Sequence, residues 1–143
     1  MYVADMNFLR YCSQCLVYAN IGRMVEFVVD TGARYTCVSY RKVNKLLNEK
    51  DMKGYEYKIF AGYVKDGRGI IHYKYRVSRF DIGDIQLGEQ DIWITFDPNA
   101  SDSILGIDML QQVTFLQIEN MKKLMFFRNI TELSRFIQEH YEN

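Results

Sequence analysis

Proline, histidine and net charge are all scarce in this chain of 143 residues. There is one proline, there are two histidines, and 18 basic side chains balance 18 acidic ones. A chain without excess positive charge lacks the electrostatic footprint of a protein that binds nucleic acid or an anionic membrane. No stretch approaches the roughly 18 consecutive apolar residues that a membrane-spanning helix needs. We therefore expect no nucleic-acid partner and no membrane partner.

The N-terminal segment also lacks the features of a secretory signal. Residues 1–10 contain Asp5 and no basic cluster, and the apolar run at residues 15–19 is too short for the hydrophobic region of a signal peptide. A chain of this length fits one domain with one hydrophobic core. We expect a soluble, cytoplasmic protein with a single domain over residues 1–143.

Cysteine is scarce as well, which limits metal and redox chemistry. Cys12 and Cys15 form a C-x-x-C motif, a pattern that is a frequent false positive when it stands alone. A structural zinc site needs four ligands, and the other cysteine and histidine residues are Cys37, His72 and His140, none at ligand spacing. The simpler interpretation places both thiols of the motif in an N-terminal strand, on opposite faces. We favour it and expect no metal and no cofactor.

One short motif carries most of the information in the sequence. An apolar run at residues 25–29 leads directly into the tetrapeptide Asp-Thr-Gly-Ala at residues 30–33. A carboxylate at the end of a buried strand is costly to desolvate, so its presence there needs a reason. A second β-like run follows at residues 36–39, and Ser-Ile-Leu-Gly-Ile-Asp-Met-Leu stands far downstream at residues 103–110. The Asp-Thr-Gly motif occurs once in the chain.

This pattern resembles the retropepsins, the single-lobe aspartic proteases of the retroviral type. The strand, the Asp-Thr-Gly-Ala loop and the Ile-Leu-Gly segment followed by Asp-x-Leu all match, and residues 16–27 resemble the family's opening hairpin. The resemblance covers roughly residues 15–118, by pattern rather than by identity. It implies a mainly β fold, the closed barrel of the acid proteases, with its core at roughly residues 15–128. It also implies a homodimer in which each chain supplies one aspartate.

Two helices are predicted outside the family's β pattern. After the motif, Ser39 can cap a short helix that runs to about residue 49, with apolar residues at i, i+3 and i+4. Near the C-terminus, Asn129 followed by Glu132 forms a capping pair for a helix over residues 130–141. Retroviral enzymes end in a strand instead, so the sequence leaves open whether this helix covers its own barrel or the partner's.

The resemblance assigns roles to the residues of the loop. Asp30 is the catalytic residue, because peptide hydrolysis of this kind uses a water molecule held between two carboxylates. Two carboxylates about 3 Å apart share one proton, so one can act as base while the other acts as acid. Thr31 is expected to hydrogen-bond across the dimer axis, and Gly32 to leave room for the substrate backbone. Ala33 stands where two-lobed enzymes usually carry a hydroxyl that bonds the catalytic carboxylate.

The downstream glycine segment is expected to support this loop. By resemblance, Leu105 and Gly106 pack beneath it, where glycine permits a close crossing of two chain segments. In retroviral enzymes an arginine commonly follows this glycine and pairs with an acid just after Asp-Thr-Gly-Ala, whereas here Ile107 and Arg34 occupy those positions. Arg34 could pair with Asp108 in reversed polarity, or it could face solvent or substrate, and the sequence leaves these alternatives open.

A long hairpin is predicted between the motif and the downstream glycine, with strands at residues 55–64 and 70–80. The Asp-Gly dipeptide at its turn tolerates two positive φ angles, so we expect a tight tip. Taken alone, the pattern indicates only a surface hairpin. Its position matches the family's flap, so the resemblance implies a segment that closes over substrate. The candidate flap residues are Gly62, Tyr63, Val64, Asp66, Gly67 and Gly69.

Three functions fit the sequence. The first is an aspartic endopeptidase that hydrolyses a peptide or protein substrate with the two Asp30 carboxylates of a homodimer. The alternative is a non-catalytic module of the same fold that mediates dimerisation or peptide binding, since a fold does not guarantee activity. The third is an unrelated small β-barrel with a chance motif. The intact Asp-Thr-Gly sequence favours the first, because a decayed active site usually loses its aspartate.

Overall fold

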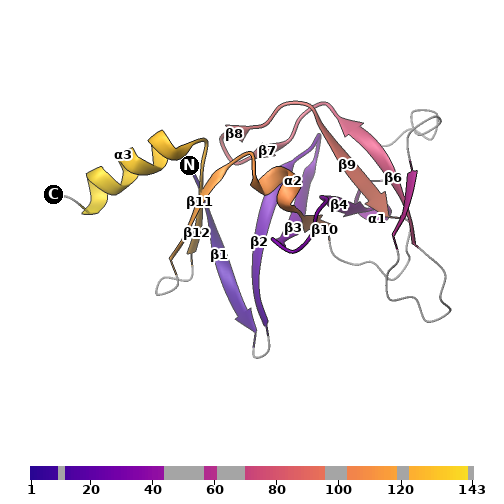
Figure 1. The fold of residues 1–143 in the computed structure, drawn as a ribbon, viewed down its shortest axis with the longest axis horizontal. Helices are drawn as coiled ribbons and strands as arrows, with labels where there is room; N and C mark the ends of the chain where they lie inside the picture. Colours follow the sequence, from indigo (N-terminus) through magenta and orange to yellow (C-terminus); the bar gives the residue numbers. More distant parts are fainter. Residues whose placement is uncertain (10–11, 44–56, 61–69, 96–102, 119–122, 142–143) are drawn as a thin grey trace.

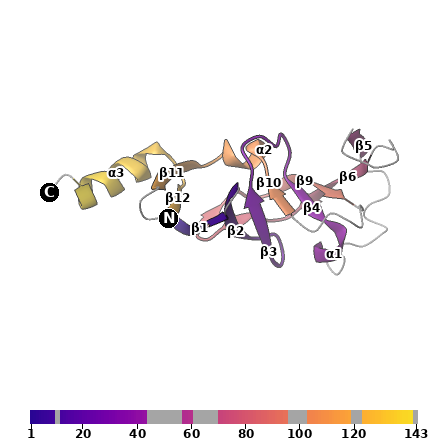
Figure 2. The same cartoon turned by 90° about the horizontal axis from the view of Figure 1, so that it is seen from below.

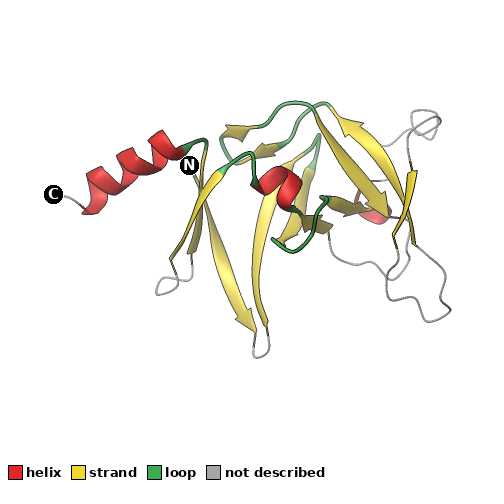
Figure 3. Cartoon of the chain, in the orientation of Figure 1, coloured by secondary structure: helices red, strands yellow, loops and turns green. Residues whose placement is uncertain are grey.

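A computed structural model describes residues 1–9, 12–43, 57–60, 70–95, 103–118 and 123–141 of the chain. Over these residues the fold is a curled sheet of 12 strands with three helices (Figures 1 and 3). The strands are β1 (Tyr2–Leu9), β2 (Cys12–Asn20), β3 (Met24–Val29), β4 (Cys37–Ser39), β5 (Tyr57–Phe60), β6 (Ile70–Val77), β7 (Asp81–Ile82), β8 (Ile85–Gln86), β9 (Gln90–Thr95), β10 (Ser103–Leu105), β11 (Thr114–Ile118) and β12 (Lys123–Phe127). The helices are α1 (Tyr40–Val43), α2 (Ile107–Leu110) and α3 (Ile130–Tyr141). None of the helices in these segments is long and apolar enough to span a membrane.

The order of the strands determines where the Asp-Thr-Gly loop must lie. The sheet runs β11-β12-β1-β2-β3-β10-β4-β9-β6-β5, with the small β7–β8 hairpin attached to β2. Neighbouring strands in the described sheet pair antiparallel, except for two parallel pairs, β3 with β10 and β4 with β9. β10 therefore lies between β3 and β4, although only residues 30–36 join those two strands. The loop has to arch over the end of β10.

Alternating burial along the strands produces the core. In β3 the side chains of Val25 and Phe27 are buried while Glu26 between them is half-buried, the period of two expected for a strand with one face on the core. Phe27 packs against Phe80, with 5.7 Å between ring centres. Burying a phenylalanine fully stabilises a fold by roughly 1.5–3 kcal/mol, so this pair anchors the strand that ends at the motif.

The predicted elements on either side of the motif are confirmed, whereas β1 is a strand that was not predicted. β2 and β3 form the opening hairpin, and Gly22 at its turn has a φ of 107°, in the left-handed region that favours glycine. α1 begins directly after Ser39, while residues 44–49 of the predicted helix lie outside the described residues. β1 pairs with β12 and β2, and Ala4 is buried. Asp5 interrupts its apolar pattern, so the sequence does not indicate a strand there.

Helix α3 covers residues 130–141, as predicted, and extends away from the sheet (Figures 1 and 2). Asn129 caps it, because its Oδ1 accepts a hydrogen bond from the N–H of Glu132 at 2.9 Å. The ring of Phe136 packs against that of Phe127 on β12, with 5.5 Å between their centres. The half-buried face of the helix thus contacts strands of its own chain.

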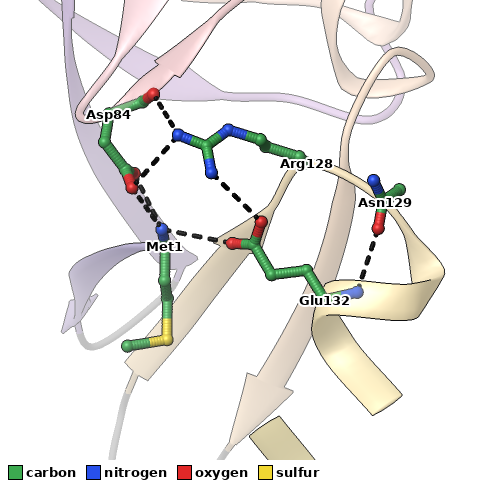
Figure 4. Close-up of polar contacts among 5 residues, drawn as sticks. All are labelled: Met1, Asp84, Arg128, Asn129 and Glu132. Carbon is green, nitrogen blue, oxygen red and sulfur yellow. Dashed lines mark hydrogen bonds and ion pairs between the residues drawn. The ribbon is translucent and has the colours of Figure 1, made fainter. Parts of the chain in front are cut away.

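A cluster of charges joins the N-terminus, the β7–β8 turn and the start of α3 (Figure 4). The Met1 amino group bonds both carboxylate oxygens of Asp84, at 2.7 and 2.8 Å, and lies 3.3 Å from Glu132. Arg128 pairs with Asp84 at 3.5 Å and with Glu132 at 3.4 Å. The hydrogen bond from the amino group, aided by the charge of that group and of Arg128, lowers the pKa of Asp84. Because exposed ion pairs add little stability, we expect the cluster mainly to orient α3.

The cap of α3 gives a first testable prediction. Asn129→Ala removes the acceptor for the Glu132 N–H and should lower the free energy of unfolding by about 1 kcal/mol. Urea unfolding followed by circular dichroism measures the change. Thr131→Ala is the matched control, because Thr131 is exposed in the same first turn, and it should change stability by less than about 0.5 kcal/mol. Equal effects of the two substitutions would remove the capping role.

Candidate active site

Asp30 stands where β3 ends and the chain leaves the sheet. Its backbone N–H donates to the carbonyl oxygen of Leu105 at 3.0 Å, which anchors the residue to β10. Its side chain is exposed, and Oδ1 accepts a hydrogen bond from the N–H of Gly32 at 2.9 Å. Among the described residues, no other hydrogen bond or ion pair reaches this carboxylate. The acid is therefore held by its own loop, and its second oxygen is available to a ligand.

The predicted neighbours of Asp30 form a tight loop around it. The N–H of Ala33 donates to the carbonyl oxygen of Asp30 at 3.2 Å, which closes a turn over Thr31 and Gly32. Both of these residues are exposed, whereas Ala33 is half-buried. A Cβ on Gly32 would lie 3.2 Å from Oδ1 of Asp30, so a side chain here would press on the carboxylate. Glycine leaves the acid in place with its outer surface open.

Leu105 and Gly106 lie against this loop, which crosses them closely. Leu105 is fully buried. A Cβ on Gly106 would lie 2.6 Å from the carbonyl carbon of Tyr35, 2.7 Å from its oxygen and 2.9 Å from the carbonyl oxygen of Ala33. Beyond the crossing, the N–H of Ile107 donates to the carbonyl oxygen of Ala33 at 2.8 Å. Only a residue without a side chain fits between these backbones.

The far end of the loop is held by two polar side chains whose partnership the sequence did not indicate. The hydroxyl of Thr36 donates to Oδ1 of Asp108 at 2.7 Å, and the N–H of Thr36 lies 3.0 Å from both carboxylate oxygens. Arg34 is exposed, and the described partner of Asp108 from this loop is Thr36 rather than Arg34, so solvent or substrate remains the expected environment of Arg34. The sequence does contain a signal that could have indicated this pair, since Thr36 and Asp108 each interrupt an otherwise apolar run.

Of the hairpin that carries the candidate flap, the structure describes only the two strands at the base, β5 and β6. β5 and β6 pair antiparallel, with Phe60 opposite Ile70, as the predicted hairpin requires. The six candidate flap residues lie outside the described residues: Gly62, Tyr63, Val64, Asp66, Gly67 and Gly69. Their role in binding substrate stays a prediction.

The structure brings together Cys37 and His72, which are far apart in the sequence. The Sγ of Cys37 on β4 lies 3.6 Å from Nδ1 of His72 on β6. In the described part of the chain, no group of three or more His, Cys, Asp or Glu residues is placed to hold a metal ion. Burial raises the pKa of the Cys37 thiol to about 12, and a backbone hydrogen bond from Thr95 offsets only part of this rise. The thiol is therefore protonated at neutral pH, a form that neither binds metal nor attacks as a nucleophile.

A curled, mainly antiparallel sheet with one exposed Asp-Thr-Gly carboxylate, crossed by an Ile-Leu-Gly segment, defines the class of single-lobe aspartic-protease folds. The chain belongs to the family described as "gag-polyprotein putative aspartyl protease", whose model matches residues 17–112. That range includes Asp30 and Gly106. No curated protein is significantly similar to the chain in sequence.

Several solved structures are similar to this chain. A retropepsin-like aspartic protease from Rickettsia conorii has a TM-score of 0.62 and 16% identity, over 85% of this chain and 94% of that one. EIAV protease complexed with the inhibitor HBY-793 has a TM-score of 0.49 and 16% identity, over 73% and 92%. The retroviral protease-like domain of Ddi1 from Leishmania major has a TM-score of 0.48 and 20% identity, over 78% and 92%. The Rickettsia structure confirms the retropepsin-like fold predicted from the sequence.

The crossing at Gly106 can be tested by adding a single methyl group. Gly106 has a φ of −92°, which any residue adopts, so the cost of Gly106→Ala is steric and should reach at least about 1–3 kcal/mol of unfolding free energy. Gly88→Ala is the control, because nothing lies within 4 Å of its added Cβ and only its φ of 76° opposes the change. Urea unfolding compares the two. A Gly106→Ala protein as stable as the unmodified protein would contradict the close crossing.

The raised pKa of Cys37 predicts a thiol that resists alkylation. With a pKa of about 12, roughly one thiol in ten thousand is ionised at pH 8, and only the thiolate reacts. Iodoacetamide should label the peptide that contains Cys37 much more slowly in the native protein than in urea, as followed by mass spectrometry. Equal labelling rates in the two conditions would show that the thiol is neither buried nor protonated as described.

Proposed function

We propose that this chain is an aspartic endopeptidase that works as a homodimer, with one Asp30 from each copy. The observation that carries the proposal is the exposed Asp30 carboxylate, held by the Gly32 N–H on a loop that is pinned to β10. Membership of an aspartyl protease family and the retropepsin-like fold support it.

The second copy is needed because hydrolysis of this kind takes two carboxylates. The sequence has a single Asp-Thr-Gly motif. Among the described residues, no second carboxylate bonds to Asp30. A two-fold axis that passes beside the loops would set the two Asp30 side chains next to each other. Thr31 is exposed on the same turn, where it can hydrogen-bond to the partner's loop.

The chemistry follows from two acids that share one proton. The ionised Asp30 takes a proton from a water molecule, and that water attacks the carbonyl carbon of the scissile peptide bond. The protonated Asp30 of the other copy donates its proton to the carbonyl oxygen, which gives a neutral tetrahedral intermediate. Transfer of a proton to the amide nitrogen then breaks the C–N bond and releases an amine and an acid.

The substrate class is a peptide or a protein, because the open side of the loop suits an extended backbone. Gly32 presents no side chain next to the carboxylate, so a peptide backbone can approach the acid closely.

A cytoplasmic location, expected from the sequence, stays a prediction.

Asp30→Asn tests the proposal directly. Asparagine has the same shape but can neither accept the proton of water nor share one, so hydrolysis of a peptide library should fall by at least 10²–10⁴-fold while the fold is kept. Pepstatin, which mimics the tetrahedral intermediate, should inhibit the unmodified protein. Asp91→Asn is the matched control, since the described side-chain partners of Asp91 are Lys74 and Arg76 on β6, in surface ion pairs. The Asp91→Asn protein should cleave normally.

Two results would contradict this function. Unchanged hydrolysis in the Asp30→Asn protein would remove this residue from the mechanism. A well-folded unmodified dimer that cleaves nothing in the library but still binds peptides would favour the alternative, a non-catalytic binding module. Analytical ultracentrifugation of both proteins shows whether the dimer forms.

A further inference from the structure

Thr36 and Asp108 connect the Asp30 loop to helix α2 through their side chains. We propose that they are positioning residues, which set the place of Asp30 without touching substrate. The inference rests on the proposed function, because it concerns where the two catalytic carboxylates stand in the dimer.

The hydroxyl of Thr36 bonds in two directions. It donates to Oδ1 of Asp108 at 2.7 Å and accepts a hydrogen bond from the N–H of Gly106 at 3.0 Å. The N–H of Thr36 reaches both oxygens of Asp108 at 3.0 Å, and the N–H of Met109 donates to Oδ1 at 2.8 Å. Thr36 is 0% exposed, so water does not compete for these bonds. Removing the hydroxyl would leave the Gly106 N–H buried without its partner.

Among the described links between the loop and residues 105–108, those that use side chains are the bonds of Thr36 with Asp108 and with Gly106. Asp30 and Ala33 are attached by backbone hydrogen bonds, which do not depend on the side chain at either position. Thr36 is attached by its side chain, and its carbonyl oxygen also accepts from the N–H of Trp93 on β9 at 2.9 Å. The loop, α2 and β9 therefore meet at Thr36. A substitution there can move the loop while the other links remain.

Symmetry makes the position of the loop critical. In a homodimer a displacement of the loop occurs in both copies, so the separation of the two Asp30 carboxylates changes by up to twice that displacement. Carboxylates that share a proton stand about 3 Å apart, and a misplacement of about 1 Å can cost on the order of 10²-fold in rate. Loss of the Thr36–Asp108 connection should therefore lower kcat more than it raises KM.

The test compares Thr36→Val with Thr36→Ser. Valine keeps the shape and loses both hydroxyl bonds, whereas serine keeps the hydroxyl. Expressed per folded dimer, kcat for a peptide substrate should fall by about 10-fold or more in the Val protein, with KM changed less than about threefold, and the Ser protein should recover most of the rate. Circular dichroism and sedimentation give the concentration of folded dimer. Thr114→Val, a half-buried threonine on β11, is the matched control and should keep the unmodified rate.

Each outcome of this comparison either supports or overturns the positioning role of Thr36 and Asp108. A Val protein with unmodified kcat per folded dimer, or a Ser protein as slow as the Val protein, would overturn the positioning role. If the Val protein does not fold, Asp108→Asn replaces it: the neutral carboxamide keeps one acceptor oxygen and loses the charge that strengthens the bonds from Thr36, so a fall in kcat of several-fold is expected and an unchanged kcat overturns the inference. Failure of the proposed function is distinguishable, because the unmodified protein would then show no hydrolysis that depends on Asp30.

Discussion

The constraint on which the rest of the site depends is the crossing of residues 30–36 over the end of β10. Because β10 lies between β3 and β4, the chain has to pass over Gly106 to reach the second strand. The backbones come so close that a Cβ on Gly106 would lie 2.6 Å from Tyr35. Backbone hydrogen bonds from Asp30 to Leu105 and from Ile107 to Ala33 lock the crossing on both sides. The position of the acid thus follows from the topology of the sheet.

The same crossing supports the proposal that one chain forms half of a site. It holds the Asp30 carboxylate at the surface with a single internal hydrogen bond, from Gly32, and no described group neutralises or completes it. An exposed carboxylate in this position has little structural value for a monomer, since no other described group pairs with it. It has a clear use in a symmetric dimer, where two copies create a shared-proton pair. The Thr36–Asp108 hydrogen bond also ties the crossing to α2.

Features that depend on the local chemistry of a few neighbouring residues could be predicted from the sequence. The Asp-Thr-Gly loop, the opening hairpin and the Asn129 cap of α3 are all encoded by short patterns of turn, strand and cap residues, and each has the predicted place. Contacts between distant segments were harder to predict. The partners of Asp108 and Cys37 lie 72 and 35 residues away, and strand β1 is stabilised by β12 from the other end of the chain. Such pairings depend on the three-dimensional arrangement of the strands, which no local pattern records.

Subunit mixing measures most directly whether two copies share one active site. Unmodified protein and Asp30→Asn protein are mixed in equal amounts and allowed to exchange subunits. The rate of hydrolysis by the mixture is then compared with that of unmodified protein at the same total protein concentration. If both Asp30 carboxylates are needed, mixed dimers are inactive and the rate falls to roughly one quarter, because only dimers of two unmodified copies cleave. A rate of roughly one half, proportional to the fraction of unmodified chains, would show that each chain acts alone and would contradict the account.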